Sequence, residues 1–94
     1  MRSLSFTTTL ERDKDGTWWY AHVPSEVRNE LRHLGRRGII PVLAMLGDTT
    51  WEATLMPWAD GSAQIVVNRN VREREQLELG QTLRLTVRPR DEPS

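Results

Sequence analysis

Two histidines, His22 and His33, are the side chains best suited to acid–base chemistry near neutral pH in this sequence of 94 residues. A general base or a metal site needs partners at a defined spacing, and neither histidine belongs to a motif such as His-x-x-x-His. His33 falls near the end of an expected helix, where the helix dipole favours a cation. We therefore expect neither histidine to be catalytic.

The carboxylates are scattered and form no pair suited to general acid–base catalysis. Those in expected turns or exposed segments, where a solvated charge is the usual role, are Asp13, Asp15, Glu73, Glu75 and Glu78. The chain has no cysteine, which removes disulfides, thiolate catalysis and zinc ribbons. It also has no glycine-rich phosphate loop behind a strand. The sequence predicts no catalytic residue, no metal site and no cofactor.

Tryptophan is the strongest remaining signal, because the chain has four of these large rings, each with one N–H donor. Trp51 lies in an alternating segment and is expected in the core. Trp18 and Trp19 are adjacent in an expected strand, so their rings point to opposite faces and only one can enter the core. The outward ring, with Trp58 in a turn, predicts a ligand groove or a subunit contact. The competing interpretation is a ring lying flat on its own surface under arginine stems.

We take five residues as candidates for binding a ligand or a partner: Trp18, Trp19, Trp58, Arg69 and Arg72. The favoured hypothesis is a small non-catalytic binding or assembly module. Its partner would be a small molecule, a peptide, another protein or a second copy of the chain in a homodimer.

A nucleic-acid-binding protein is the alternative, and an enzyme of unknown class comes third. The arginines that would contact nucleic acid are Arg28, Arg32, Arg36, Arg37, Arg69, Arg72 and Arg74. The chain has 13 basic and 13 acidic residues, so its formal charge is zero. Glutamates interleaved with these arginines cancel much of the attraction to phosphate, which favours the binding module.

Periodicity indicates the elements that must position these residues. Alternation of apolar and polar side chains predicts strands over residues 4–10, 17–23, 39–46, 50–56, 63–67 and 82–88. The run 39–46 is apolar almost throughout, which is typical of a strand buried on both sides. Pro24 at the start and Gly35 at the end bound a helix over 24–34, and a shorter helix is expected over 69–75.

Residues 23–45 and 67–89 look like two versions of one unit. Val27 corresponds to Val71 and Arg28 to Arg72, a constant spacing of 44 residues (71 − 27 = 72 − 28 = 44). Two copies are too few for a solenoid. We therefore expect a pseudo-two-fold domain in which the two helices occupy equivalent places.

Several short segments carry a family resemblance: residues 18–24, Ile40-Pro41-Val42, 54–57, Val71-Arg72 and Leu79-Gly80. In these the chain resembles a small bacterial family of domains of unknown function that elsewhere precedes a YdeI/OmpD-associated domain. The resemblance extends from Phe6 to Val87. It implies a double-split β-barrel, related in fold to the swapped-hairpin barrels of AbrB-type and MazE-type DNA-binding proteins, and no established activity. Two residues depart from the family pattern, since a lysine is common where this chain has Asn68 and an acidic residue where it has Gln81.

The expected fold is thus mainly β, a pseudo-two-fold barrel of about six to seven strands with one or two short helices. One domain over 1–88 would be followed by a charged tail over 89–94 that has nothing to bury and frays. The amino terminus lacks the apolar core of a signal peptide, and no segment reaches membrane-spanning length. A cytoplasmic location without membrane contact is the default expectation.

Overall fold

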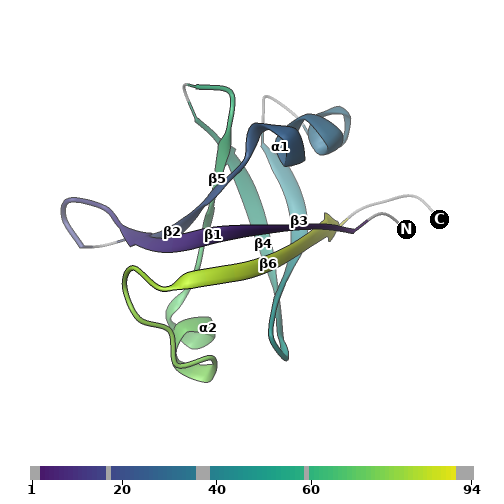
Figure 1. Ribbon diagram of the computed structural model, residues 1–94. Helices are drawn as coiled ribbons and strands as arrows, with labels where there is room; N and C mark the ends of the chain where they lie inside the picture. Colours follow the sequence, from purple (N-terminus) through teal and green to yellow (C-terminus); the bar gives the residue numbers. More distant parts are fainter. Residues whose placement is uncertain (1–2, 17, 36–38, 59, 91–94) are drawn as a thin grey trace.

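The computed structural model describes residues 3–16, 18–35, 39–58 and 60–90. Six strands form a barrel, with a short helix near each end (Figure 1). The strands are β1 (Leu4–Arg12), β2 (Trp19–Val23), β3 (Ile40–Leu46), β4 (Thr49–Pro57), β5 (Ala63–Val66) and β6 (Thr82–Pro89). The prediction of a mainly β barrel with two short helices is confirmed.

The barrel is closed and entirely antiparallel, with the strand order β1-β2-β5-β4-β3-β6. Period-two alternation directs one face of each strand inward, so that Leu10, Leu55 and Leu85 are fully buried. In β3 every second residue is buried, while Leu43 and Met45 on the outer face are half-buried. The expectation that this run is buried on both sides is therefore wrong, because the outer face of β3 has no second layer to cover it.

The first helix, α1 (Ser25–Leu31), continues as a 3-10 turn, η1 (Arg32–Leu34), and the second, α2, covers Arg69–Arg74. Both expected helices are present to within a residue or two at each end. Val27 and Leu31 anchor α1 in the core, and Val71 anchors α2. The two helices lie at opposite ends of the barrel (Figure 1). None of the helices in the described residues is long and apolar enough to cross a membrane.

The two halves of the chain are interchangeable in the strand order. If β1 is exchanged with β4, β2 with β5 and β3 with β6, strands that were neighbours in the barrel remain neighbours. Ala21 pairs with Ile65, the residue 44 positions later, so the pseudo-two-fold axis passes through this pair (65 − 21 = 44). The strands β1 and β4 are offset by one residue more at this end, since Leu10 pairs with Ala21 and Leu55 with Ile65 (55 − 10 = 45). Helix α1 joins β2 to β3 just as α2 joins β5 to β6. In topology the helices occupy equivalent places, as the 44-residue spacing predicts.

The end of β6 lies beyond the expected domain boundary at residue 88. Pro89 is buried and pairs with Val42, and the Arg90 N–H donates to the Pro41 carbonyl at 3.2 Å. These contacts tie the first two residues of the expected tail to β3. The rest of that tail, residues 91–94, lies outside the described residues.

Candidate binding groove

A groove of about 760 Å³ lies on the outer surface, across β2, β5 and β4 and under the β1–β2 hairpin. Its aromatic lining comes from Trp18, Tyr20, Trp51 and Trp58, and Met56 and Val66 add apolar surface. Trp18 is 58% exposed and Trp58 is 45% exposed. Two large rings thus remain in contact with solvent, although a small protein has few large apolar side chains with which to build its core.

Trp58 folds back onto β2. Its ring stacks on Tyr20, with ring centroids 6.3 Å apart and planes inclined by 23°. Two main-chain bonds close the turn, because Trp58 N–H donates to the Ser62 carbonyl and Gly61 N–H donates to the Trp58 carbonyl. The ring is therefore held as a fixed wall of the groove, although almost half of its surface stays open.

The same turn is stabilised by the Asp60 carboxylate. Asp60 Oδ1 accepts from the Ser62 N–H at 2.9 Å and from the Ser62 hydroxyl. These two bonds favour the ionised form and hold the pKa of Asp60 below its usual value of 3.8, the hydroxyl contributing more than the main-chain N–H. Ser62 itself is buried, so the bonds also satisfy its polar atoms.

The β1–β2 hairpin forms the opposite border. Asp13 N–H donates to the Trp18 carbonyl, and Trp18 N–H donates back to the Asp13 carboxylate at 3.2 Å. Gly16 takes a φ of +72°, which closes this turn without a steric penalty. The hairpin places Arg12, Asp13 and Lys14 beside the groove, where Glu52 lies on the β4 side. Two positive and two negative side chains therefore line it, and their formal charges cancel.

Trp51 forms part of the floor. The expected core position holds only in part, because Trp51 is half-buried: it packs against the core but also lines the groove beside Ala53. Its Nε1 donates to the Val66 carbonyl at 3.4 Å. The indole therefore bridges β4 and β5 where the two strands separate.

Trp19 and Arg72 lie outside the groove and contact each other. Trp19 is half-buried against the core, and the Arg72 guanidinium sits over its ring at 4.3 Å, while Arg12 approaches it at 5.8 Å. A cation over an indole face is attracted by the ring quadrupole. The alternation rule thus explains why Trp18 faces outward while Trp19 is covered by α2.

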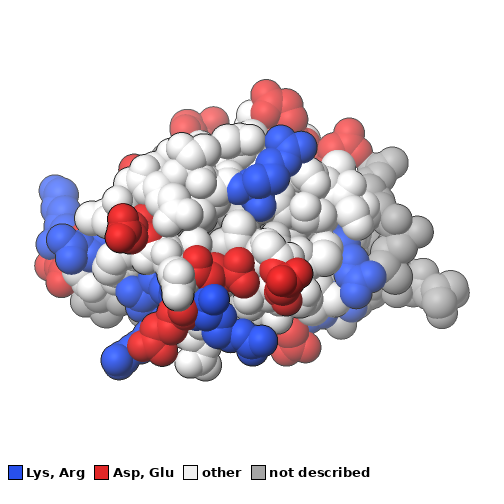
Figure 2. All heavy atoms as spheres, turned by 60° about the horizontal axis from the view of Figure 1, so that its bottom comes forward, with Lys and Arg blue, Asp and Glu red and all other residues white. Residues whose placement is uncertain are grey.

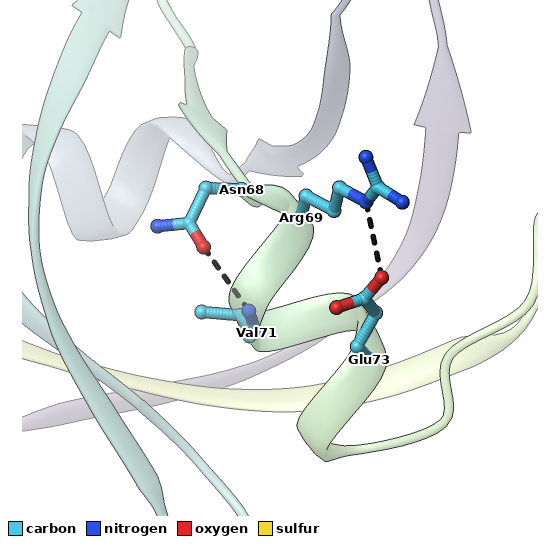
Figure 3. A network of polar contacts seen from close by, with 4 residues as sticks. All are labelled: Asn68, Arg69, Val71 and Glu73. Carbon is cyan, nitrogen blue, oxygen red and sulfur yellow. Dashed lines mark hydrogen bonds and ion pairs between the residues drawn. The ribbon is translucent and has the colours of Figure 1, made fainter.

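Arg69 is the most exposed of the five candidates. Its Nε donates to Glu73 at 3.0 Å within α2, and the two side chains are 82% and 62% exposed (Figure 3). The structure thus brings Trp18 and Trp58 together in one groove, but not Trp19, Arg69 or Arg72. A binding role for any of the five stays a prediction.

Tyr20, Met56 and Val66 are groove residues that sequence reasoning did not single out. Tyr20 could have been found, since it is two residues from Trp18 and must share its face of β2. Met56 and Val66 could not, because their place beside Tyr20 depends on the order of the strands around the barrel.

Both departures from the family pattern have structural roles in this chain. Asn68 is the N-cap of α2, and its Oδ1 accepts from Val71 N–H at 3.0 Å (Figure 3). Its side chain also lines the groove. Gln81 Oε1 accepts from Glu78 N–H at 2.9 Å and fixes the turn before β6.

Charge is mixed over the α2 end of the barrel, which comes forward in Figure 2. Blue and red side chains alternate there and do not gather into one basic surface (Figure 2). In the described parts of the chain, no three His, Asp or Glu side chains are grouped so that they could hold a metal ion.

A comparison with curated proteins found no match. Residues 6–87 match the family described as "Domain of unknown function (DUF1905)", which spans the barrel from β1 to β6. This range agrees with the resemblance expected from Phe6 to Val87, and the description assigns no activity. Because the match covers most of the sequence, the chain belongs to the DUF1905 family.

Proposed function

We propose that this chain is a non-catalytic binding module whose ligand lies in the groove across β2, β5 and β4. One observation carries the proposal: Trp18 and Trp58 are 58% and 45% exposed and line the same groove of about 760 Å³. Ligand pockets in proteins usually measure about 300–1,000 Å³ and combine apolar walls with a few polar groups. The ligand is a small molecule, a peptide or a segment of a partner protein.

The groove has the rigidity that recognition requires. The Tyr20–Trp58 stack and the two bonds within the Trp58 turn hold one wall, while the paired bonds between Asp13 and Trp18 hold the other. Rings fixed in this way lose little conformational freedom when a ligand binds. Asn68 and Gln64 supply amide groups that can orient the ligand.

No observation favours the nucleic-acid alternative. Arg28 donates to the Ser62 carbonyl, Arg69 pairs with Glu73, and Arg72 covers Trp19. The helices that carry these arginines lie at opposite ends of the barrel (Figure 1). Arg36 and Arg37 lie outside the described residues. The cytoplasmic location is no premise of the proposal and stays a prediction.

A fluorescence titration with 8-anilinonaphthalene-1-sulfonate tests the proposal, because this aromatic anion brightens in apolar sites. The native protein should bind the probe at one site, and Trp18→Ala combined with Trp58→Ala should weaken binding about tenfold or more. Leu79→Ala is the matched control, since Leu79 is another large exposed apolar residue and does not line the groove.

Near-ultraviolet circular dichroism must show that each variant keeps its packed core, because loosely packed states also bind this probe. Equal affinity of the native protein and the double variant would contradict the proposed site. An equal loss in Leu79→Ala would contradict it as well.

A further inference from the structure

We infer that the ligand is an extended peptide that adds a strand to the open edge of β4. The inference rests on the proposed function, because the peptide occupies the same groove. In this mode of recognition, main-chain hydrogen bonds supply affinity and pockets for alternate side chains supply specificity.

The strand β4 has an edge that no neighbouring strand covers. It pairs with β3 from Thr49 to Leu55, but with β5 only from Leu55 to Pro57. Over the first part of β4, the barrel is therefore split on the β5 side, and none of the described strands pairs with that edge. An uncovered edge presents a row of N–H and C=O groups.

The ladder alternation shows which main-chain groups face this split. Trp58 N–H donates to the Ser62 carbonyl at 3.0 Å, which marks the first hydrogen-bonded rung between β4 and β5. Main-chain groups of an antiparallel strand point to the same side at every second residue. The main-chain N–H and C=O groups of Met56 therefore face β5, and those of Thr54 and Glu52 face the split.

The β3–β4 hairpin independently indicates the same orientation of the main-chain groups of β4. Leu46 and Thr49 pair across a two-residue turn, so their main-chain groups face each other. Every second residue after Thr49 has the same orientation, so the main-chain groups of Trp51 and Ala53 point toward β3. Those of Glu52 and Thr54 again face the split.

Trp51 bonds to β5 at the rung where the β4–β5 pairing would continue. The pairing of Met56 with Gln64 and of Leu55 with Ile65 would continue with Thr54 opposite Val66. At that rung the Val66 carbonyl accepts from Trp51 Nε1 instead. The indole thus takes the acceptor that the Thr54 N–H would otherwise use.

The groove follows this edge. Four consecutive residues of β4, 51–54, line it. Successive side chains of a strand point to opposite faces, so a groove that touches all four must run along the edge. The edge from Thr50 to Thr54 is about 13 Å long at about 3.3 Å per step, which suits a peptide segment of about five residues.

Other occupants fit these features less well. A phosphate-rich ligand gains no net attraction from a lining in which Arg12 and Lys14 are balanced by Asp13 and Glu52. A small aromatic molecule would contact the rings but leave the main-chain groups of Glu52 and Thr54 unused.

The test begins with random seven-residue peptides displayed on phage and selected against the native protein. An enriched peptide is then synthesised with one N-methyl group at each position in turn and titrated by calorimetry. Because donors toward β4 occur at every second residue, methylation should weaken binding about tenfold or more at alternate positions and much less between them. Affinity should also change little with salt, because no phosphate contacts are involved.

Two variants test the protein side of the pairing. Thr54→Pro removes the N–H that faces the groove, where proline is tolerated because that N–H bonds no strand. It should weaken peptide binding about tenfold or more relative to Thr54→Val, which also changes the groove-lining side chain but keeps the N–H. Thermal unfolding shows whether Thr54→Pro folds, and if it does not, the N-methyl series alone decides.

The outcomes separate this inference from the proposed function. No enriched peptide, an N-methyl profile without alternation, or native affinity in folded Thr54→Pro would each overturn strand addition. If the naphthalene probe still binds at Trp18 and Trp58 in that case, the groove stands and takes a small molecule. If the probe fails as well, the proposed function fails with it.

Discussion

Thr8 and Trp51 form corresponding bonds in the two halves of the barrel. Thr8 Oγ1 donates to the His22 carbonyl of β2 at 2.7 Å, and Trp51 Nε1 donates to the Val66 carbonyl of β5 at 3.4 Å. His22 and Val66 are equivalent positions, since 66 − 22 = 44. In one half a small hydroxyl bridges the strands, and in the other a large indole does so.

Both halves contain a strand that changes partner partway along its length. β1 pairs with β6 from Leu4 to Thr9 and with β2 from Leu10 to Arg12. β4 passes from β3 to β5 in the same manner. The split is thus a feature of both halves. The size of the bridging side chain and the aromatic residues around it distinguish the half that carries the groove.

The equivalent arginines differ in a similar way. Arg28 Nη1 on α1 donates to the Ser62 carbonyl at 3.1 Å, whereas Arg72 on α2 lies over the Trp19 ring. One guanidinium fixes the turn that carries Trp58, and the other covers an indole. The comparison teaches that a shared framework of strands accepts different side-chain contacts at matched positions.

The two helices should differ most in what anchors them. Leu31 on α1 is 1% exposed, so Leu31→Ala should cost about 2–5 kcal/mol of unfolding free energy. The equivalent residue is Glu75, the C-cap of α2, which accepts from the Thr49 hydroxyl at 2.5 Å. Glu75→Ala should cost less, about 1–3 kcal/mol, because it removes one hydrogen bond to a charged group. Urea unfolding measures both, and a larger cost for Glu75→Ala would reverse the comparison.

Trp58→Ala should separate binding from stability. The binding free energy of 8-anilinonaphthalene-1-sulfonate should fall by about 2 kcal/mol or more, as for a central aromatic anchor. The loss of its stack on Tyr20 should cost about 1 kcal/mol of stability, well below the roughly 3–5 kcal/mol of a core aromatic.

Lys14 borders the same groove from the turn between β1 and β2, and Lys14→Ala should change stability little. Denaturation with light scattering on each protein gives stability and association together. A large loss of stability in Trp58→Ala with unchanged binding and association would show that this ring belongs to the core.

The N-termini of α1 and α2 should differ in how much a capping side chain stabilises them. Asn68 caps α2 through its bond to Val71 N–H, whereas Pro24 at the start of α1 makes no side-chain cap. Asn68→Ala should cost about 1 kcal/mol, and Asn68→Asp should cost little because its carboxylate can accept the same bond. Thermal unfolding of the two variants checks this. Equal losses would show that the side chain acts through the groove or through packing.

The smallest expected effect is the titration of Asp60. Its bonds to Ser62 lower its pKa in the folded state, so its stabilising contribution is complete above 3.8 and is lost as the pH falls through the lowered pKa. Carbon NMR of the carboxyl group should give a midpoint below 3.8, and Ser62→Ala should raise it. In the corresponding turn of the first half, Gly16 N–H donates to the Asp13 carbonyl as Gly61 N–H donates to the Trp58 carbonyl, so Asp15 occupies the place of Asp60. A midpoint at or above 3.8 would show that the bonds do not persist in solution.

Local patterns were enough to predict most of the framework. The alternation around Phe6 and Leu85 predicts strands, and Pro24 and Gly35 bound the first helix, because these signals depend on residues close together in the chain. The spacing between Arg28 and Arg72 predicts equivalent helices. The adjacency of Trp18 and Trp19 alone requires one ring to face outward.

Only the tertiary structure decided what surrounds these residues. That Trp58 stacks on Tyr20, that Arg72 covers Trp19, and that Trp51 reaches the Val66 carbonyl all depend on contacts between different strands and helices. The sequence determined which face of each strand a side chain occupies, because that alternation is local. It did not determine which strands become neighbours, because that choice depends on burying one shared core, and the groove exists only where β2, β5 and β4 meet.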